Sequence, residues 1–257
     1  MKNIKLNGKN ESGFTLVELA IVMIIIGLLI GGILKGQQLI ANAEISATVS
    51  EVKGVDSAIS TFREAYAALP GDMSNVAARV PNCSNACARD GNANGSIGDG
   101  PGAAHATLAN ENGAAWAQLA AADMLSNIIS TNATTVVTGL TNSIPDASSG
   151  GQIQLGFTQT GALTSSVIVN TTGGHFLLID NSGPALAAPG TASLSQSEAA
   201  RLDRKLDDGA PNTGSVRAMG AGAAATAANC ASTATVTGAY NEAFGSVVCG
   251  LYIRIQS

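Results

Sequence analysis

The chain has 257 residues, enough for one or two domains with a sizeable core. Apolar residues make up 46% of it, but only 4% are aromatic and 12% charged, about half the usual charged share, which is atypical of a cytosolic enzyme. The formal net charge of −5 disfavours nucleic-acid binding, and the scarcity of Glu, Lys and Arg excludes a long coiled coil.

The most apolar part of the chain lies near its N-terminus. Residues 14–34 read FTLVELAIVMIIIGLLIGGIL and contain a single charge, Glu18. As an α-helix this segment is about 31 Å long, which matches the hydrocarbon thickness of a bilayer. Three lysines precede it, so the positive-inside rule predicts a cytoplasmic N-terminus in the inner membrane, with the rest of the chain exported. A cleaved secretory signal is the alternative, but Lys35 and the helical pattern beyond it disfavour cleavage there.

Glu18 is the most informative residue of this segment. A carboxylate in lipid costs about 2.5–3.5 kcal/mol near a helix centre and less near the helix end. It either reaches back to the cytoplasmic headgroups or needs a fixed cation as its partner.

The residues around Glu18 resemble a known signal. The string GFTLVE at residues 13–18, after a short basic leader and before the apolar helix, resembles the prepilin signal of the type IV pilin and type II secretion pseudopilin family. The resemblance implies that a prepilin peptidase cleaves after Gly13 and methylates the new N-terminus at Phe14. It also implies that Glu18 pairs with the terminal amine of a neighbouring subunit. Loss of three Lys and one Glu with the leader would leave the mature chain more acidic.

The helical pattern continues beyond the membrane segment. Residues 35–69 carry an apolar stripe among polar positions, and Pro70 followed by Gly71 ends it. The stripe consists of Leu39, Ala43, Ile45, Val49, Val52, Ile59, Phe62 and Tyr66. A helix over 14–69 is about 84 Å long, too long to fold back into one compact domain. Four glycines permit close contact between membrane helices or a local bend: Gly27, Gly31, Gly32 and Gly36.

These features divide the chain into four parts. They are a leader at 1–13, a transmembrane and filament-core helix at 14–34, its amphipathic continuation at 35–69, and a globular head at 70–257. The fold class expected from the resemblance is α+β and type IV pilin-like. In it, the long N-terminal helix packs against a head with an antiparallel sheet and a disulfide-tied C-terminal region.

The head begins with turn-forming residues. Residues 71–112 are rich in Asn, Gly, Ala, Ser and Asp, which predicts a long loop without a core pattern. Residues 111–129 predict a helix with one apolar face formed by Trp116, Leu119, Ala120 and Met124. Short strands are predicted at 134–138, 152–157, 166–169 and 175–179.

The C-terminal part of the head carries a further helix and the clearest strand. Ser195 and Glu198 have capping-box spacing, and a helix follows to Leu206. Apolar and other residues alternate over 247–256, which predicts a strand with one buried face. The apolar set is Val247, Cys249, Leu251, Ile253 and Ile255.

Four cysteines in an exported head favour two disulfides, for which three pairings exist. Pairing by proximity joins Cys83 to Cys87 and Cys230 to Cys249. The second pair contributes about 3 kcal/mol on the chain-entropy estimate and resembles the C-terminal disulfide loop of type IV pilins. A zinc site receives weak support, because His105 and His175 are distant in sequence.

Two acidic loops are candidate calcium sites. The first matches the start of a calcium loop through Asp90, Asn92, Asn94 and Asp99, but Pro101 stands at the position of the bidentate Glu. Asp99 or Glu111 is a substitute ligand, and an Asx-rich turn is at least as good an interpretation of the loop.

The second acidic loop has Asp207 and Asp208 at a helix C-terminus, where the dipole disfavours negative charge. Either a cation compensates, or one of Arg201, Arg204 and Lys205 does. The string DRKLDDGAPNTG and the string PGDM at 70–73 resemble a recurring element of proteobacterial pilin-like proteins, and calcium in the heads of pseudopilins makes an ion plausible here.

Catalytic motifs are absent from the sequence, so we expect no enzyme and no cofactor beyond calcium. Both histidines are expected at the surface or in loops. The resemblance implies a structural subunit of a type IV pilus-like filament outside the cytoplasm. Its partners would be copies of itself or other pilins, the prepilin peptidase, the pilus or secretion assembly machinery and membrane lipid. The alternatives are a pseudopilin in a periplasmic filament and a membrane-anchored adhesive module.

Overall fold

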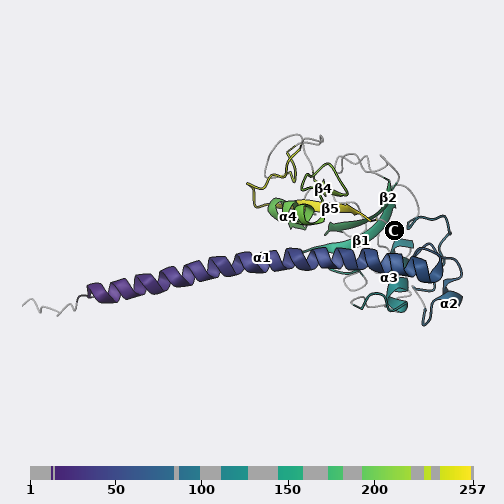
Figure 1. Cartoon of the computed structure of the whole chain (residues 1–257), viewed down its shortest axis with the longest axis horizontal. Helices are drawn as coiled ribbons and strands as arrows, with labels where there is room; N and C mark the ends of the chain where they lie inside the picture. The colour runs from purple at the N-terminus through teal and green to yellow at the C-terminus, as the bar shows by residue number, and fades with distance from the viewer. Residues whose placement is uncertain are drawn as a thin grey trace, which may run out of the picture. The chain divides into compact units, whose positions relative to one another are not determined.

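The computed structural model describes residues 13, 15–83, 87–98, 111–126, 144–158, 173–181, 193–220, 229–232 and 238–255. Figure 1 shows its helices and strands along the chain. The contacts within the chain divide it into two compact units, Met1–Ala43 and Glu44–Ser257, which are described separately. The boundary falls inside the first helix, so the head unit includes the second half of that helix.

Helix α1 spans Leu16–Tyr66, close to the expected 14–69. The four glycines at its membrane end stay helical, and a Cβ atom at any of them would meet nothing within 4 Å. The helix ends at Tyr66 because Ala67 has a left-handed backbone with φ of 50°. The long N-terminal helix is therefore confirmed, with each end two to three residues shorter than expected.

In the head unit, α1 contributes one side of the hydrophobic core. The residues concerned recur at helical spacing and are almost fully buried: Ile45, Val52, Val55, Ile59 and Phe62. The phenyl ring of Phe62 lies 4.6 Å from the ring of Tyr66 between centroids. The predicted stripe is confirmed from Ile45 onward, whereas Leu39 is 62% exposed.

The described residues of the head form a five-stranded antiparallel sheet. Its strands are β1 Gln152–Thr158, β2 Gly174–Asp180, β3 Leu194–Ser195, β4 Val216–Met219 and β5 Val247–Arg254. The order is β1-β2-β5-β3, and β4 also pairs with β5. In the β1 and β2 pair, Gln152 lies opposite Asp180 and Thr158 lies opposite Gly174. The C-terminal strand therefore occupies the centre of the sheet and pairs with three others.

Strand β5 corrects one sequence expectation. Alternation predicted one buried face, but its residues from Cys249 to Ile253 are all buried. The reason is that the sheet is covered on both faces, which leaves no solvent-facing side to a central strand. Gly250 and Tyr252, expected outside, are therefore inside.

Helix α3, Glu111–Ala121, also differs from expectation. We predicted a helix to residue 129 with one apolar face, but it ends eight residues earlier, because Asp123 has a left-handed backbone with φ of 59°. Its residues from Glu111 to Leu119 are buried on every side. Gly113, Ala114 and Ala117 are small enough for neighbouring segments to pack closely around them.

Helix α4, Gln196–Leu206, forms as predicted, with a capping box between Ser195 and Glu198. The Ser195 N–H donates to the Glu198 carboxylate at 2.8 Å, and the Glu198 N–H donates to the Ser195 hydroxyl at 3.3 Å. The helix packs on β3, β4 and β5. The predicted strands at 134–138 and 166–169 lie outside the described residues, as do Phe14, Asp99 and His105.

Candidate functional site: the N-terminal signal and the head loops

The carboxylate of Glu18 is held by the start of its own helix. One oxygen, Oε2, accepts the Thr15 N–H at 2.9 Å and the Thr15 hydroxyl at 2.9 Å. The Glu18 N–H donates to the Thr15 hydroxyl oxygen at 3.3 Å. The two residues form a capping box that satisfies otherwise unpaired groups at the helix N-terminus. The T-x-x-E spacing at 15–18 is its sequence signal, and our reading of the sequence overlooked it.

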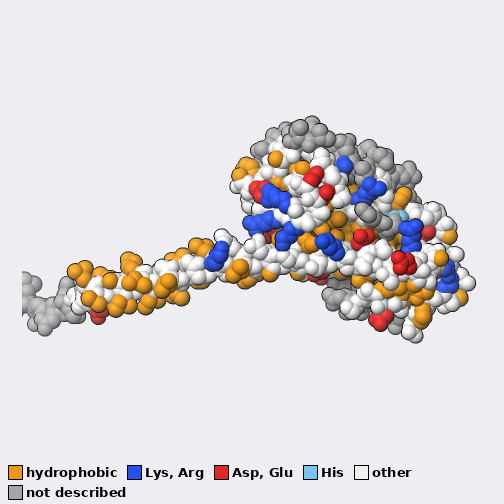
Figure 2. Space-filling model, viewed as in Figure 1, with side chains coloured by type: hydrophobic (Ala, Val, Ile, Leu, Met, Phe, Trp, Pro, Cys, Tyr) orange, Lys and Arg blue, Asp and Glu red, His pale blue; other side chains and the backbone are white. Residues whose placement is uncertain are grey.

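The helix that follows Glu18 is suited to an apolar environment. Its most apolar 18-residue window has a mean hydropathy of 2.8, and none of that window is buried in the structure. Figure 2 shows hydrophobic side chains covering this part of α1. Because water-exposed leucines and isoleucines in such a continuous array are unfavourable, this surface requires lipid or other protein. By length and composition, α1 can cross a membrane.

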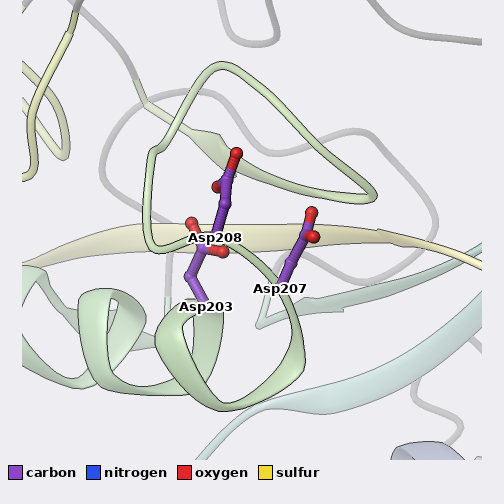
Figure 3. A group of neighbouring side chains, drawn as sticks. All are labelled: Asp203, Asp207 and Asp208. Carbon is purple, nitrogen blue, oxygen red and sulfur yellow. The ribbon is translucent and has the colours of Figure 1, made fainter.

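In the head, three carboxylates lie together where α4 ends. Oxygens of Asp203, Asp207 and Asp208 lie within 4.8 Å of one another. Figure 3 shows the three side chains pointing toward the loop that joins α4 to β4. Sequence reasoning identified Asp207 and Asp208 but missed Asp203, which is one helical turn earlier and fully buried.

Hydrogen-bond donors surround these carboxylates, and the guanidinium group of Arg204 also interacts electrostatically with Asp203. Asp203 accepts the Tyr240 hydroxyl at 2.8 Å and the Gly209 N–H at 3.2 Å. Asp207 accepts the N–H groups of Ser215 and Val216, and Asp208 accepts the Ala210 N–H at 2.8 Å.

Two of the cations expected to compensate this charge have other partners. Arg204 forms an ion pair with Glu242, and Lys205 donates to the Ser46 hydroxyl at 2.6 Å.

Burial dominates the acid–base behaviour of Asp203. It raises the pKa of this carboxyl group to about 7, although the hydrogen bonds from Tyr240 and Gly209 act in the opposite direction. Burial likewise raises the pKa of the Tyr240 phenol above its usual range, so Tyr240 remains a hydrogen-bond donor. As a set of hard oxygen donors, the three aspartates have the chemistry that calcium prefers.

The first candidate calcium loop is built differently. The Asp90 carboxylate accepts the Val76 N–H at 2.8 Å, the Asn92 side-chain oxygen accepts the Asn94 N–H at 3.0 Å, and the Asn94 oxygen accepts the Ser96 N–H at 2.8 Å. Gly95 follows with a φ of 82°. The hydrogen bonds of Asn92 and Asn94 are those of successive Asx turns, the alternative interpretation of the loop.

Two buried carboxylates outside that string organise the same loop. Asp72 accepts the N–H groups of Asn94 at 2.9 Å and Gly95 at 2.8 Å. Glu111 accepts those of Asn92 at 2.9 Å and Gly98 at 3.0 Å. The loop that was predicted to lack core contacts is therefore held in place by hydrogen bonds to two buried carboxylates. It also contains helix α2, Val76–Arg79, and the buried side chains of Met73, Val76, Val80 and Ile97.

Two further residues complete this arrangement. The Gln118 side chain accepts the Gly71 N–H at 2.6 Å and donates to the Arg89 carbonyl at 3.1 Å. Close packing requires glycine at 91, because a Cβ atom there would collide with the main chain of Gly71 and Asp72. Sequence reasoning missed Asp72 and Gln118, since their hydrogen-bond partners are far away along the chain.

His175 corrects another expectation. It was expected at the surface or in a loop, but it lies in β2 with 7% exposure. Its Nε2 atom accepts the Ile97 N–H at 3.2 Å, and its ring lies tilted against the Phe157 ring with centroids 5.1 Å apart. The histidine therefore links the sheet to the 71–98 loop.

Comparison with known proteins identifies the N-terminal segment. Residues 8–34 match the prokaryotic N-terminal methylation motif. This segment is a type IV prepilin-type signal. No curated protein and no solved structure matches the chain. The assignment therefore rests on the signal, and the head is interpreted from its own structure.

The prepilin-type signal agrees with the rest of the fold. Proteins with such signals are structural pilin-type subunits rather than enzymes, and the motif implies processing by prepilin peptidase and assembly with other pilins. A long apolar helix, an antiparallel sheet and disulfides in the head make the chain pilin-like in architecture. The motif also fits a membrane-anchored precursor that is later part of an extracellular or periplasmic filament.

The two disulfides join the pairs expected by proximity. Cys83 is bonded to Cys87 with Cα atoms 5.2 Å apart, and Cys230 is bonded to Cys249 with Cα atoms 5.0 Å apart. The second bond ties the segment after β4 to the central strand β5. All four cysteines are consumed, so the zinc alternative has no thiolate ligands.

Proposed function

We propose that this protein is a structural subunit of a type IV pilus-like filament. Its precursor lies in the inner membrane with the leader in the cytoplasm. Prepilin peptidase cleaves after Gly13 and methylates Phe14, and the processed chains polymerise through their N-terminal helices. Glu18 pairs with the terminal amine of the neighbouring copy.

The observation that carries this proposal is the continuity of the signal with the helix behind it. Residues 8–34 match the methylation motif, and from Leu16 the same residues form a helix with exposed apolar side chains. A simple membrane tether would need an apolar helix but no Glu18, which is costly in lipid. A carboxylate at this place is understandable if a fixed cation of another subunit meets it.

The test is mass spectrometry of filaments sheared from cells that express the full chain. We expect an N-terminal peptide that begins at Phe14 and carries one methyl group on its amine. Chain recovered only in membranes with its leader attached would contradict the proposal. Recovery of the processed chain from the periplasm rather than the surface would support a pseudopilin, which carries the same type of signal.

A matched pair of glycine variants controls the processing step. Gly13→Leu should block cleavage and leave the chain with its leader, since glycine precedes the cleaved bond. Gly8→Leu makes the same change in side chain within the leader but away from that bond, and it should be processed normally. Equal processing of the two variants would refute the assigned cleavage position.

A further inference from the structure

The head has a pocket of about 580 Å³ beside the C-terminal end of α1. The end of the helix and the turn after it line the pocket through Arg63, Ala67, Ala68 and Leu69. The opposite wall comes from the loop described above, including Met73 and Arg79. A volume of this size accommodates a side chain with its flanking main chain or a small ligand.

Two guanidinium groups border the pocket from different elements. Arg79, at the end of α2, donates to the main-chain carbonyl of Tyr66, which fixes its position at the end of α1. A guanidinium has five N–H groups, so this bond leaves donors available for a ligand. Arg63 lies in the last turn of α1 and is exposed.

Of the pocket-lining residues that the structure describes, Asp72 is the one acidic side chain, so two guanidinium groups and one carboxylate leave the lining with a formal charge of +1. Asp72 is 5% exposed, and both its oxygens accept N–H groups from Asn94 and Gly95. His175 accepts a hydrogen bond from the Ile97 N–H through Nε2. The pocket therefore offers guanidinium donors at its rim above a lining of Ala, Leu and Met, which suits a carboxylate on a short apolar stem.

The lining favours a peptide over a sugar. Among the described residues that line the pocket, the only aromatic ring is the imidazole of His175, so the aromatic platform on which sugars stack is missing. Alanine and methionine side chains pack well against a polypeptide. The chain itself is a source of carboxylates, because its acidic residues outnumber its basic ones by 18 to 13.

We propose that this pocket, named here the Arg63 pocket, binds an aspartate or glutamate side chain of a second copy of the chain. The inference rests on the proposed filament function and names one contact within it. A head-to-tail polymer joins two different surfaces of each subunit, one of which receives the other. The Arg63 pocket is the receiving surface, and its guanidinium groups pair with the incoming carboxylate.

The first test compares two charge reversals in the full chain. Arg63→Glu places a carboxylate at the pocket, and Arg201→Glu makes the same change at an exposed arginine on α4 that does not line the pocket. We expect Arg63→Glu to lower the amount of chain in sheared filaments at least fivefold at an unchanged membrane level. Arg201→Glu should leave it within twofold of wild type.

Two results would separate the failure of this inference from the failure of the proposed function. Wild-type chain that never enters filaments would refute the filament function itself. Wild-type chain that assembles, together with an Arg63→Glu variant that assembles equally well, would overturn the Arg63 pocket alone. An Arg63→Glu variant that assembles normally but no longer binds an anionic sugar would overturn it as well.

A second variant tests the contact directly. Arg63→Lys keeps the positive charge and introduces an amine that a water-soluble carbodiimide couples to a touching carboxylate, forming an amide and releasing the urea of the reagent. In treated filaments we expect a dimer that depends on the substitution, with a cross-linked peptide joining position 63 to an acidic residue of another copy. Cross-links only within one chain, or none that depend on the substitution, would refute the proposal.

Discussion

Glu18 has one role that the structure shows and a second role that we propose. In the single chain its carboxylate caps α1 by accepting the Thr15 N–H and hydroxyl. Capping requires only an acceptor oxygen, whereas pairing with the amine of a neighbouring subunit requires a negative charge. The two roles can therefore be separated by a substitution that keeps the oxygen and removes the charge.

Glu18→Gln is that substitution. The glutamine oxygen can still accept from Thr15, so we expect normal membrane insertion, as measured by alkaline extraction. Without the charge, filament incorporation should fall about tenfold, a loss of about 1.4 kcal/mol or more in the association step. Glu18→Ala removes both roles and should assemble no better. A glutamine variant that assembles like wild type would show that capping suffices.

Asp203 makes the stability of the head depend on pH. Its folded pKa of about 7 lies above the ordinary value of 3.8, so the folded state holds the proton more tightly than the unfolded state. Its favourable contribution is complete below pH 3.8 and is lost as the pH rises to 7. The difference is about 4 kcal/mol at most, since each pKa unit corresponds to about 1.4 kcal/mol.

Asp203→Asn should remove most of this dependence. We expect the melting temperature of the full chain in detergent, followed by circular dichroism with a chelator present, to fall by several degrees between pH 5 and pH 7.5. The asparagine variant should show a much smaller decrease over the same interval. Asp123→Asn, at an exposed aspartate outside the cluster, is the control and should behave like wild type. Parallel curves for wild type and Asp203→Asn would contradict the assigned pKa.

At the scale of elements, buried carboxylates give the 71–98 loop its conformation. Asp72 and Glu111 each accept two main-chain N–H groups from a segment that is rich in glycine and asparagine. Such a segment has little apolar surface to bury, so hydrogen bonds to charged acceptors take the place of packing. Glu111 is the first residue of α3, and its carboxylate accepts two N–H groups of the loop. These hydrogen bonds explain why a polar residue begins a buried helix.

Replacing Glu111 tests this account. Glu111→Ala leaves the N–H groups of Asn92 and Gly98 without their acceptors, and we expect a loss of about 2–4 kcal/mol in the free energy of unfolding. Glu111→Gln keeps one acceptor oxygen and should lose about half as much. Glu64→Ala, at an exposed site on α1, is the control and should change stability by less than about 0.5 kcal/mol. Denaturant unfolding of the full chain gives the three values.

The α4–β4 loop permits a test of calcium. We expect calcium to raise the melting temperature of the full chain relative to a chelator, because three aspartates lie within reach of one ion. The increase should be larger at pH 8 than at pH 5.5, since binding requires ionised Asp203. Magnesium at the same concentration is the control. Equal melting temperatures with calcium and with chelator would refute binding at this loop.

For the whole molecule, the low charge and high apolar content have two separate origins. The strongly apolar residues are concentrated in the first part of α1, where they are exposed. The head is instead rich in small and uncharged polar residues. An apolar helix without partners cannot remain in water, so this part of the chain requires lipid or other protein around it.

This organisation predicts the topology of the precursor. In spheroplasts of cells that lack the assembly machinery, added protease should digest the head, while in intact inside-out vesicles the head should be protected. The basis is the asymmetry of the leader, where Lys2, Lys5 and Lys9 precede the apolar run. Exchanging all three lysines for glutamate should reduce correct insertion severalfold. Exchanging them for arginine preserves the charge and is the control. Protection of the head in spheroplasts would contradict the topology.

Sequence by itself determined the elements whose cause is local. Neighbouring residues were enough to predict the prepilin-type signal, the long apolar helix, the capping box of α4, strands β1, β2 and β5, and both cysteine pairs. Periodicity, capping and loop closure depend on short separations along the chain. The same reasoning should have found the Thr15 and Glu18 box, because its signal spans only four residues.

Only the tertiary structure decided which side chains became buried and what they hold. Segments that are distant in sequence cover β5 on both sides, bury His175 and bury Asp203, whose hydrogen-bond partner Tyr240 comes from the C-terminal part of the head. The Arg63 pocket likewise joins the end of α1 to the 71–98 loop and β2. The physical reason is that burial and hydrogen bonding depend on what packs against a residue, and its immediate sequence contains little of that information.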